Sequence, residues 1–197
     1  MRFLPKLFEN NRAWAARAGE RDRELFDRMA QGQAPRILWI GCGDSRVPAE
    51  TVVGLQPGQL FVHRNVANLA SRDDPSTRAV LQFTVEVLKV EHIVICGHYG
   101  CGGVRAALQG GAPPAVLEWV APIADESENH AAELEALDDE ARWRRLCELN
   151  VGHQVREVCA SGPVTGAWSR GQSLVVHGWI YDPATGLLAD LDLSRDR

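Results

Sequence analysis

Residues 36–48 read RILWIGCGDSRVP, and this stretch decides how the rest of the chain can be arranged. It begins as the apolar run 37–40 and passes into a glycine-flanked segment that carries Cys42, Asp44 and Arg46. A short apolar run bounded by glycine predicts a buried strand that ends in a loop. In open parallel sheets, ligands bind at the carboxyl ends of the strands. The three polar residues fall at i, i+2 and i+4, so an extended continuation of the strand would direct them to one side.

Further strands and helices follow this stretch along the chain. Apolar runs predict strands at residues 60–64, 92–96 and 173–181 and an edge strand at 187–193, while helical spacing predicts helices at 76–90, from 104 and at 138–159. Helices that alternate with strands require crossover connections, which favour parallel pairing. We therefore predict an α/β fold: a mainly parallel β-sheet flanked by helices, with an N-terminal helical arm and a C-terminal edge strand.

The N-terminal arm has no apolar core of its own in the sequence. Residues 3–31 are expected to be helical, with acidic residues and arginines interleaved as on a solvent-facing surface. The arm, residues 1–33, is therefore either a surface helix or a contact with a second subunit. The whole chain of 197 residues suits a single domain.

Composition excludes several classes of protein. The formal charge of −5 and the lack of a basic stripe argue against binding to nucleic acid or to an anionic membrane. The sequence has no apolar run near the ~20 residues that a membrane span needs, and its start lacks the apolar core of a signal peptide. Five cysteines are an odd number and do not suggest a disulfide framework. Reduced thiols and a cytoplasmic location are therefore predicted.

A second glycine-rich turn, GHYGCGG at 97–103, follows the strand predicted at 92–96. It carries His98 and Cys101, and together with Cys42 these residues form a Cys₂His set. Such a set suits Zn²⁺ in catalytic sites because it leaves the fourth coordination position open. We predict one zinc ion per chain, within a single catalytic domain. The other cysteines, at 96, 147 and 159, lie in apolar patterns and are expected to be core residues.

The pattern Cys42-x-Asp44-x-Arg46 followed by His98-x-x-Cys101 resembles the signature of the β-class carbonic anhydrases. The resemblance runs from about residue 31 to 193 and includes FVHRNVAN at 61–68 and HGW at 177–179. It implies that Cys42, His98 and Cys101 bind zinc and that Asp44 and Arg46 form a catalytic dyad. The implied reaction is the reversible hydration of CO₂ to bicarbonate and a proton, catalysed by a zinc lyase.

Asp44 has two possible partners in this reading. Held by Arg46, its carboxylate can accept a hydrogen bond from the water at the metal. Released from Arg46, it can fill the fourth coordination position and exclude water. Hydroxide and carboxylate then compete for one site, and rising pH favours hydroxide. Two thiolate ligands also cancel the charge of the ion, so activity is expected mainly on the alkaline side.

Three residues point to the bicarbonate-regulated subgroup of this family, often called type II. Trp39, Arg64 and Tyr181 occupy the positions where that subgroup carries a non-catalytic bicarbonate site. A guanidinium matches a planar oxyanion bidentately, and Trp and Tyr can each add a donor. Bicarbonate bound there is expected to favour the closed state, in which Asp44 is a metal ligand. The enzyme is therefore predicted to be allosteric, with its product as the inhibitor.

The resemblance places the substrate pocket at Gln33, Phe61, Val66 and Phe83. A mostly apolar pocket with one amide donor suits CO₂. Relatives often carry Tyr where this chain has Phe83, and Ser where it has Gly43. In the family, part of the pocket comes from a neighbouring subunit, so a homodimer or a dimer of dimers is expected, with the N-terminal arm as a clasp.

Two other functions fit the same residues. A β-class relative that hydrolyses CS₂ or COS would share both zinc and fold. A structural zinc module, closed by two Cys, His and Asp, would explain the four ligands but neither Arg46 nor an apolar pocket beside the metal.

Overall fold

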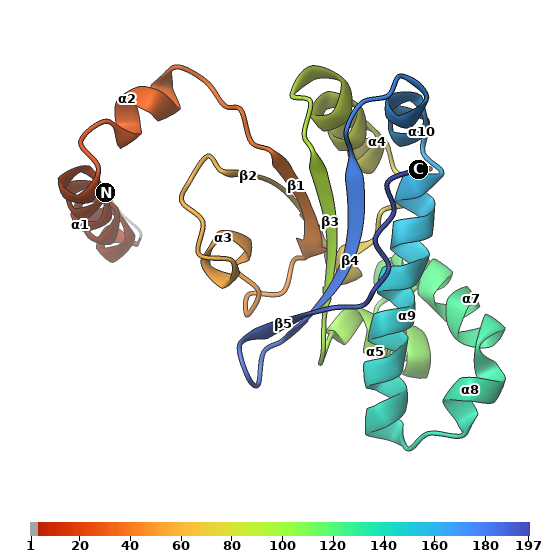
Figure 1. Cartoon of the computed structure of the whole chain (residues 1–197). Coiled ribbons are helices and arrows are strands. Elements are labelled where there is room, and N and C mark those ends of the chain that lie inside the picture. The colour runs from red at the N-terminus through yellow and green to blue at the C-terminus, as the bar shows by residue number, and fades with distance from the viewer. Residues whose placement is uncertain (1–3) are drawn as a thin grey trace. The chain divides into compact units, whose positions relative to one another are not determined.

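Five strands form one sheet in the order β2-β1-β3-β4-β5 (Figure 1). The strands are β1 (Ile37–Cys42), β2 (Leu60–Asn65), β3 (His92–His98), β4 (Val175–Asp182) and β5 (Leu187–Asp190). The first four pair in parallel, and β5 returns antiparallel along β4. This confirms the predicted mainly parallel sheet with its C-terminal edge strand. Because β1 and β3 are neighbours, their carboxyl ends meet at one edge of the sheet.

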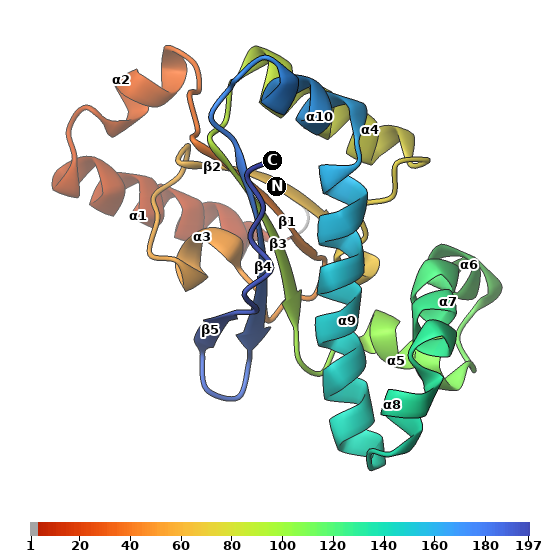
Figure 2. The same cartoon turned by 45° about the vertical axis from the view of Figure 1, so that its right-hand side comes forward.

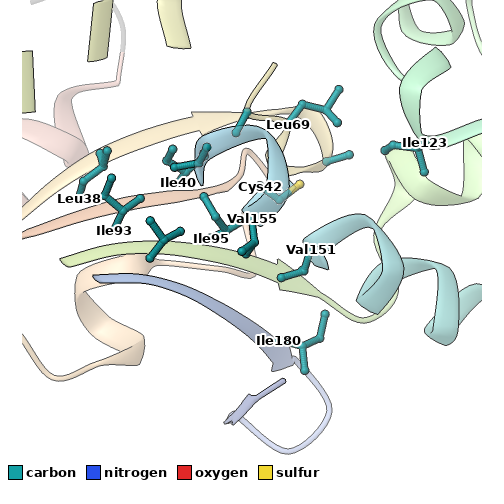
Figure 3. Close-up of a cluster of buried hydrophobic side chains, with 14 of the residues drawn as sticks. Leu38, Ile40, Cys42, Leu69, Ile93, Ile95, Ile123, Val151, Val155 and Ile180 are labelled. Atoms are coloured by element: carbon teal, nitrogen blue, oxygen red, sulfur yellow. The ribbon is translucent and has the colours of Figure 1, made fainter. Parts of the chain in front are cut away.

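The alternation of side chains along β1 divides the core between the two faces of the sheet. Leu38, Ile40 and Cys42 join the larger hydrophobic cluster (Figure 3), whereas Trp39 joins a smaller cluster on the other face with Tyr181. Leu38, Trp39 and Ile40 are each at most 1% exposed. The strand is therefore buried on both faces, as its unbroken apolar run predicts.

Helix α9 (Asp139–Cys159) packs against β3 and β4 on the side of the larger cluster (Figure 2). Its N-cap is Asp138, whose side chain accepts a hydrogen bond from the Ala141 backbone N–H. The remaining helices of this part of the chain are α3 (Ala49–Val52), α4 (Pro75–Gln82), α5 (Gly102–Gln109), α6 (Pro114–Trp119), α7 (Ala121–Asn129), α8 (Ala131–Glu135) and α10 (Gly162–Ser169), with a 3₁₀ turn η1 (Val66–Asn68) and a π-helical turn η2 (Phe83–Val87).

The computed structural model describes residues 4–197 and separates into two units, one ending at Ala34 and the other spanning Pro35–Arg197. The first unit contains α1 (Pro5–Arg21) and α2 (Leu25–Ala30), with Trp14 and Phe26 packed edge to face. The predicted helical arm is thus confirmed as two helices rather than one, since the chain leaves the helical conformation at Asp22. The predicted start at residue 3 lies outside the described residues.

Two details of the secondary structure differ from the sequence prediction. Helix α4 begins at Pro75, one residue before the predicted start at 76, and its cap is Asp74, whose carboxylate accepts hydrogen bonds from the N–H groups of Ser76 and Thr77. Helix α10 was not predicted, since its eight residues include two glycines and a proline, which are typical of a loop. Between residues 4 and 197, the structure contains no helix that is both long and apolar enough to span a membrane.

Candidate functional site

Three metal-binding side chains converge at the edge of the sheet where β1 and β3 end. Cys42 is the last residue of β1, His98 is the last of β3, and Cys101 is the N-cap of α5. Their ligand atoms all lie within 4.8 Å of one another, and the two sulfur atoms are 3.9 Å apart. Tetrahedral zinc with Zn–S bonds of about 2.3 Å needs a sulfur–sulfur distance of about 3.8 Å. The spacing of the two thiols therefore fits a zinc ion.

The orientation of His98 gives an independent sign of a missing ligand. Its Nδ1 lies 2.9 Å from the backbone oxygen of Tyr99 and so donates to it, which leaves the lone pair on Nε2. Nε2 is buried, and it has no hydrogen-bond partner among the described residues. A buried polar atom without a partner is costly. A backbone carbonyl that fixes the tautomer while the other nitrogen faces a metal is the usual arrangement for a histidine ligand.

The cysteines differ in acidity according to their surroundings. A hydrogen bond from Cys101 lowers the pKa of Cys42 to about 4, with a further contribution from His98, against the opposing effect of burial. The same contact raises the pKa of Cys101. Burial alone raises the pKa of Cys96, and it is the main reason that the pKa of Cys147 rises to about 12. Cys96 and Cys147 therefore stay protonated in the core, and Cys42 at the sheet edge is predisposed to form thiolate.

Asp44 and Arg46 lie beside this cluster as a closely held ion pair. The Asp44 carboxylate accepts hydrogen bonds from Arg46 Nε at 2.9 Å and Nη2 at 2.7 Å. Arg46 Nη2 also donates to the Gly100 backbone oxygen at 3.0 Å, which ties the pair to the glycine-rich turn. The hydrogen bonds from Arg46 hold the pKa of Asp44 well below its usual range. Asp44 Oδ2 lies 3.9 Å from His98 Nε2, so the carboxylate faces the candidate metal position.

The path of the chain between Cys42 and Arg46 differs from the expectation. The strand ends at Cys42, and a turn includes Arg46, so the three polar residues do not follow an extended continuation of β1. They converge because Arg46 folds back onto Asp44, whose carboxylate also accepts from the Arg46 backbone N–H at 2.9 Å. The turn therefore gives the carboxylate three donors from one residue.

Arg64, Trp39 and Tyr181 lie on β2, β1 and β4 and differ in what they contact. Arg64 donates from Nε to the Cys42 backbone oxygen at 2.9 Å and from Nη2 to the Asp44 backbone oxygen at 2.6 Å. Trp39 and Tyr181 are 1% and 9% exposed and belong to the smaller hydrophobic cluster. Arg64 thus braces the backbone on both sides of Gly43, a contact with main-chain oxygens that no side-chain motif reveals.

Residues expected in the substrate pocket differ in location. The rings of Phe61 and Phe83 lie 6.0 Å apart at their centroids. Val66 is 45% exposed and Phe83 is 40% exposed, so an apolar surface is open to solvent on this chain. Gln33 belongs to the N-terminal unit and is exposed there. Sequence reasoning missed two main-chain groups, the oxygens of Tyr99 and Gly100, whose only signal was the glycine-rich turn itself.

Comparison with known proteins agrees with this geometry. The sequence model of a family described as carbonic anhydrase matches residues 37–188. A carbonic anhydrase of Emericella nidulans is 44% identical over 190 residues, which cover 96% of this chain and 83% of that protein. A Coccomyxa β-carbonic anhydrase, solved in complex with acetazolamide, matches with a TM-score of 0.96 at 40% identity and covers 100% of this chain and 89% of that one.

A third match comes from one of two tetrameric β-carbonic anhydrases of Sordaria macrospora, with a TM-score of 0.91 at 39% identity. It covers 96% of this chain and 97% of that one. The match includes both glycine-rich turns and four of the five strands in full. The chain therefore belongs to the carbonic anhydrase family, in its β class, and is one of that family's enzymes.

Proposed function

We propose that this protein catalyses the zinc-dependent, reversible hydration of CO₂ to bicarbonate and a proton. The observation that carries the proposal is the unpartnered His98 Nε2 beside two thiols at the spacing that zinc needs. Cys42, His98 and Cys101 would hold the ion. When bound, zinc would supply a Lewis acid that lowers the pKa of water and so provides hydroxide to attack CO₂, and its two thiolate ligands would make this effect weaker than neutral ligands do.

Asp44, held by Arg46, would accept a hydrogen bond from the reacting water and orient it. The carboxylate is held anionic by its hydrogen bonds to Arg46, and Oδ2 faces the candidate metal position. An anionic oxygen fixed in this way is a hydrogen-bond acceptor with one defined direction. Because Arg46 is itself anchored to the Gly100 oxygen, the pair resists rotation away from the site.

The same carboxylate supports a second, closed state. Rotation of Asp44 away from Arg46 would let it act as the fourth ligand and exclude water from the site. Only about one side-chain rotation separates the two states, since Oδ2 already lies 3.9 Å from His98 Nε2. Rising pH favours the open state, in which activity is possible. This competition is the reason to expect low activity in acid.

Bicarbonate would favour the closed state by binding near Trp39, Arg64 and Tyr181, as in the type II subgroup. Arg64 braces the Asp44 backbone oxygen, so an anion that draws the guanidinium away would loosen the turn that holds Asp44 open. Arg64→Ala is expected to weaken inhibition by bicarbonate several-fold while zinc content stays the same. Arg36→Ala is a matched control. Arg36 forms an exposed ion pair with Glu91, and these two residues precede β1 and β3, at the opposite end of the strands from the candidate site. Unchanged inhibition in Arg64→Ala would exclude a regulatory bicarbonate site at Arg64.

The substrate pocket would form between Phe61, Val66 and Phe83, with Gln33 as the amide donor. The exposed fractions of Val66 and Phe83 support self-association, because a second subunit would cover this apolar surface. We therefore propose a homodimer or a dimer of dimers in which the arm of residues 1–33 contributes to the contact. The chain would then act as one catalytic domain with a cytoplasmic location.

Stopped-flow CO₂ hydration on zinc-replete protein, measured from mildly acidic to alkaline pH, tests this function. We expect low activity in acid and a steep rise with base. High activity already at acidic pH would support the CO₂ hydration activity but exclude its control by closure of Asp44. Inactivity at every pH, with one zinc bound per chain, would overturn the proposal. Turnover of CS₂ or COS by the same protein would then identify it as a relative with that activity. Absence of that turnover as well would favour a structural zinc module.

A further inference from the structure

A buried pair of amides on α9 lies behind the turn that separates β2 from α4. Asn150 and Gln154 are each 1% exposed and sit one helical turn apart, so their side chains share one face. Gln154 Nε2 donates to Asn150 Oδ1 at 3.0 Å. Neither residue belongs to the metal ligands, the Asp44–Arg46 pair or the substrate pocket.

The free ends of this pair both bind the backbone of the turn. Asn150 Nδ2 donates to the Ala67 oxygen at 3.0 Å, and Gln154 Oε1 accepts from the Ala70 N–H at 2.8 Å. These contacts bridge 83 and 84 positions in the sequence. The two amides therefore form one continuous brace from α9 to the segment 67–70.

The braced segment has a backbone conformation that its own residues do not favour. Ala67 has φ 63° and Asn68 has φ 51°, so two successive residues other than glycine occupy the left-handed region. Such a conformation persists only where surrounding contacts determine it. The buried hydrogen bonds from Asn150 and Gln154 are contacts of this kind.

This strained turn touches the chain next to all three candidate metal ligands. Cys42 pairs with Asn65 across β1 and β2, and the Gly43 N–H donates to the Asn65 backbone oxygen at 2.7 Å, directly before η1. Asn68 Oδ1 lies 3.6 Å from the position that a Cβ would take on Gly97, directly before His98. A Cβ on Gly103, two residues after Cys101, would come within 2.9 Å of the Ala67 side chain. Movement of the turn would therefore disturb the whole ligand set.

We infer that Asn150 and Gln154 are positioning residues, which hold the left-handed turn at 67–68 and through it the geometry of the Cys42, His98 and Cys101 site. The inference rests on the proposed zinc site. Contacts outside the ligand set orient the ligands, and loss of such contacts commonly weakens metal binding by about 10- to 100-fold.

The test measures zinc release and ligand geometry rather than activity. Asn150→Leu and Gln154→Met keep the side-chain volume but remove the hydrogen bonds, and Val158→Ala is the control. Val158 is 0% exposed on the same helix, so its truncation lowers stability without touching the brace. Transfer of zinc from the folded protein to a chelating dye is followed in each variant, and the thiolate charge-transfer absorption is recorded after substitution with Co²⁺.

We expect about tenfold faster zinc release and an altered Co²⁺ spectrum in both amide variants, with wild-type values in Val158→Ala. Unaltered release and spectra in the amide variants, or the same changes in Val158→Ala, would overturn the inference. If Asn150→Leu does not fold, Gln154→Met decides, because it leaves the Asn150–Ala67 hydrogen bond in place. Wild-type protein that binds no zinc would overturn the zinc site itself, a result distinct from equal release by wild type and variants.

Discussion

Two of the polar clusters in the unit Pro35–Arg197 differ in how completely the atoms of their buried side chains are paired. In the first, Cys42, His98 and Cys101 converge and leave His98 Nε2 without a partner. In the second, the buried carboxylate of Glu126 accepts from Arg156 at 2.6 Å and pairs with His153 at 3.1 Å. The first cluster is incomplete without a ligand, whereas the second is satisfied by the protein.

This difference in pairing distinguishes residues that serve function from residues that serve stability. A satisfied cluster lowers the energy of the folded chain by itself, and its residues need no further partner. An incomplete cluster costs free energy until a ligand binds, so its persistence in the fold indicates a role outside stability. Substitutions should therefore affect metal binding and activity in the first cluster, and only the free energy of unfolding in the second.

The largest expected effect is at Cys42. Cys42→Ser should remove stoichiometric zinc and reduce CO₂ hydration to the background rate, because a serine hydroxyl is a poor zinc ligand compared with thiolate. Metal analysis of the purified protein checks this. Cys96→Ser is the matched control, since Cys96 lies beside Gly41 in the register, is 0% exposed and donates only to the Gly97 oxygen. Full zinc content in Cys42→Ser would exclude Cys42 as a ligand.

The next effect is at Asp44. Asp44→Asn should lower kcat/KM by about 100-fold or more, since general acid–base groups contribute about 10²–10⁴. Zinc content should stay at one per chain, because Cys42, His98 and Cys101 remain. Glu91→Gln is the control, as it breaks an exposed ion pair far from the site. Wild-type kcat/KM in Asp44→Asn would exclude the carboxylate from the reaction.

A smaller and different effect is expected at Glu126. Glu126→Leu should lower the free energy of unfolding by about 1–2 kcal/mol, the usual cost of leaving hydrogen-bonded partners unpaired. The Arg156 side chain is 62% exposed and can return to water, which limits the loss. Urea denaturation measures the change, and kcat/KM should stay at the wild-type value. A loss of zinc in this variant would contradict the division between the two clusters.

The smallest effect concerns the pH dependence of stability. Burial is the largest influence on Glu126 and opposes its ionisation, but the hydrogen bonds and charges of Arg156 and His153 together outweigh burial and lower the pKa below the ordinary value of 4.5. The unfolded chain therefore binds the proton more tightly, so the contribution of Glu126 is present above about pH 5 and is lost as pH falls through the lower folded-state pKa.

When the pH is lowered from 6 to 3, the urea midpoint of unfolding should accordingly fall more steeply in wild type than in Glu126→Gln. The amide keeps the shape of the side chain and an acceptor oxygen but does not titrate. Parallel curves for the two proteins would show that Glu126 has the same pKa in both states.

Much of the first cluster could be predicted from the sequence because its signals are local. The apolar run before Gly41 predicts a buried strand, and His98 and Cys101 share one glycine-rich turn. Parallel pairing then brings β1 and β3 together, and the structure confirms that they are neighbours. The assignment of roles to Asp44, Arg46, Trp39, Arg64 and Tyr181 stays a prediction.

The second cluster and the amide brace could not be predicted, because their partners are distant in the sequence. Glu126 meets residues 27 and 30 positions away, and Asn150 meets a backbone oxygen 83 positions away. A polar residue in a helix carries no sign of whether it will face solvent or a buried oxygen. Asp74 was missed as a cap for the related reason that several residues nearby can cap a helix equally well.

The sequence by itself therefore determined the α/β class and the chemical identity of the candidate metal ligands, since residue type and hydrophobic period are local properties of the chain. Only the tertiary structure decided that Arg46 folds back onto Asp44, that His98 Nε2 is left unpaired, and that Ala67 and Asn68 are held in a left-handed turn. Arg46 is anchored to the Gly100 oxygen 54 positions away, and the turn at 67–68 is held by hydrogen bonds that span 83 and 84 positions. Such bonds exist only once the core has brought the segments together.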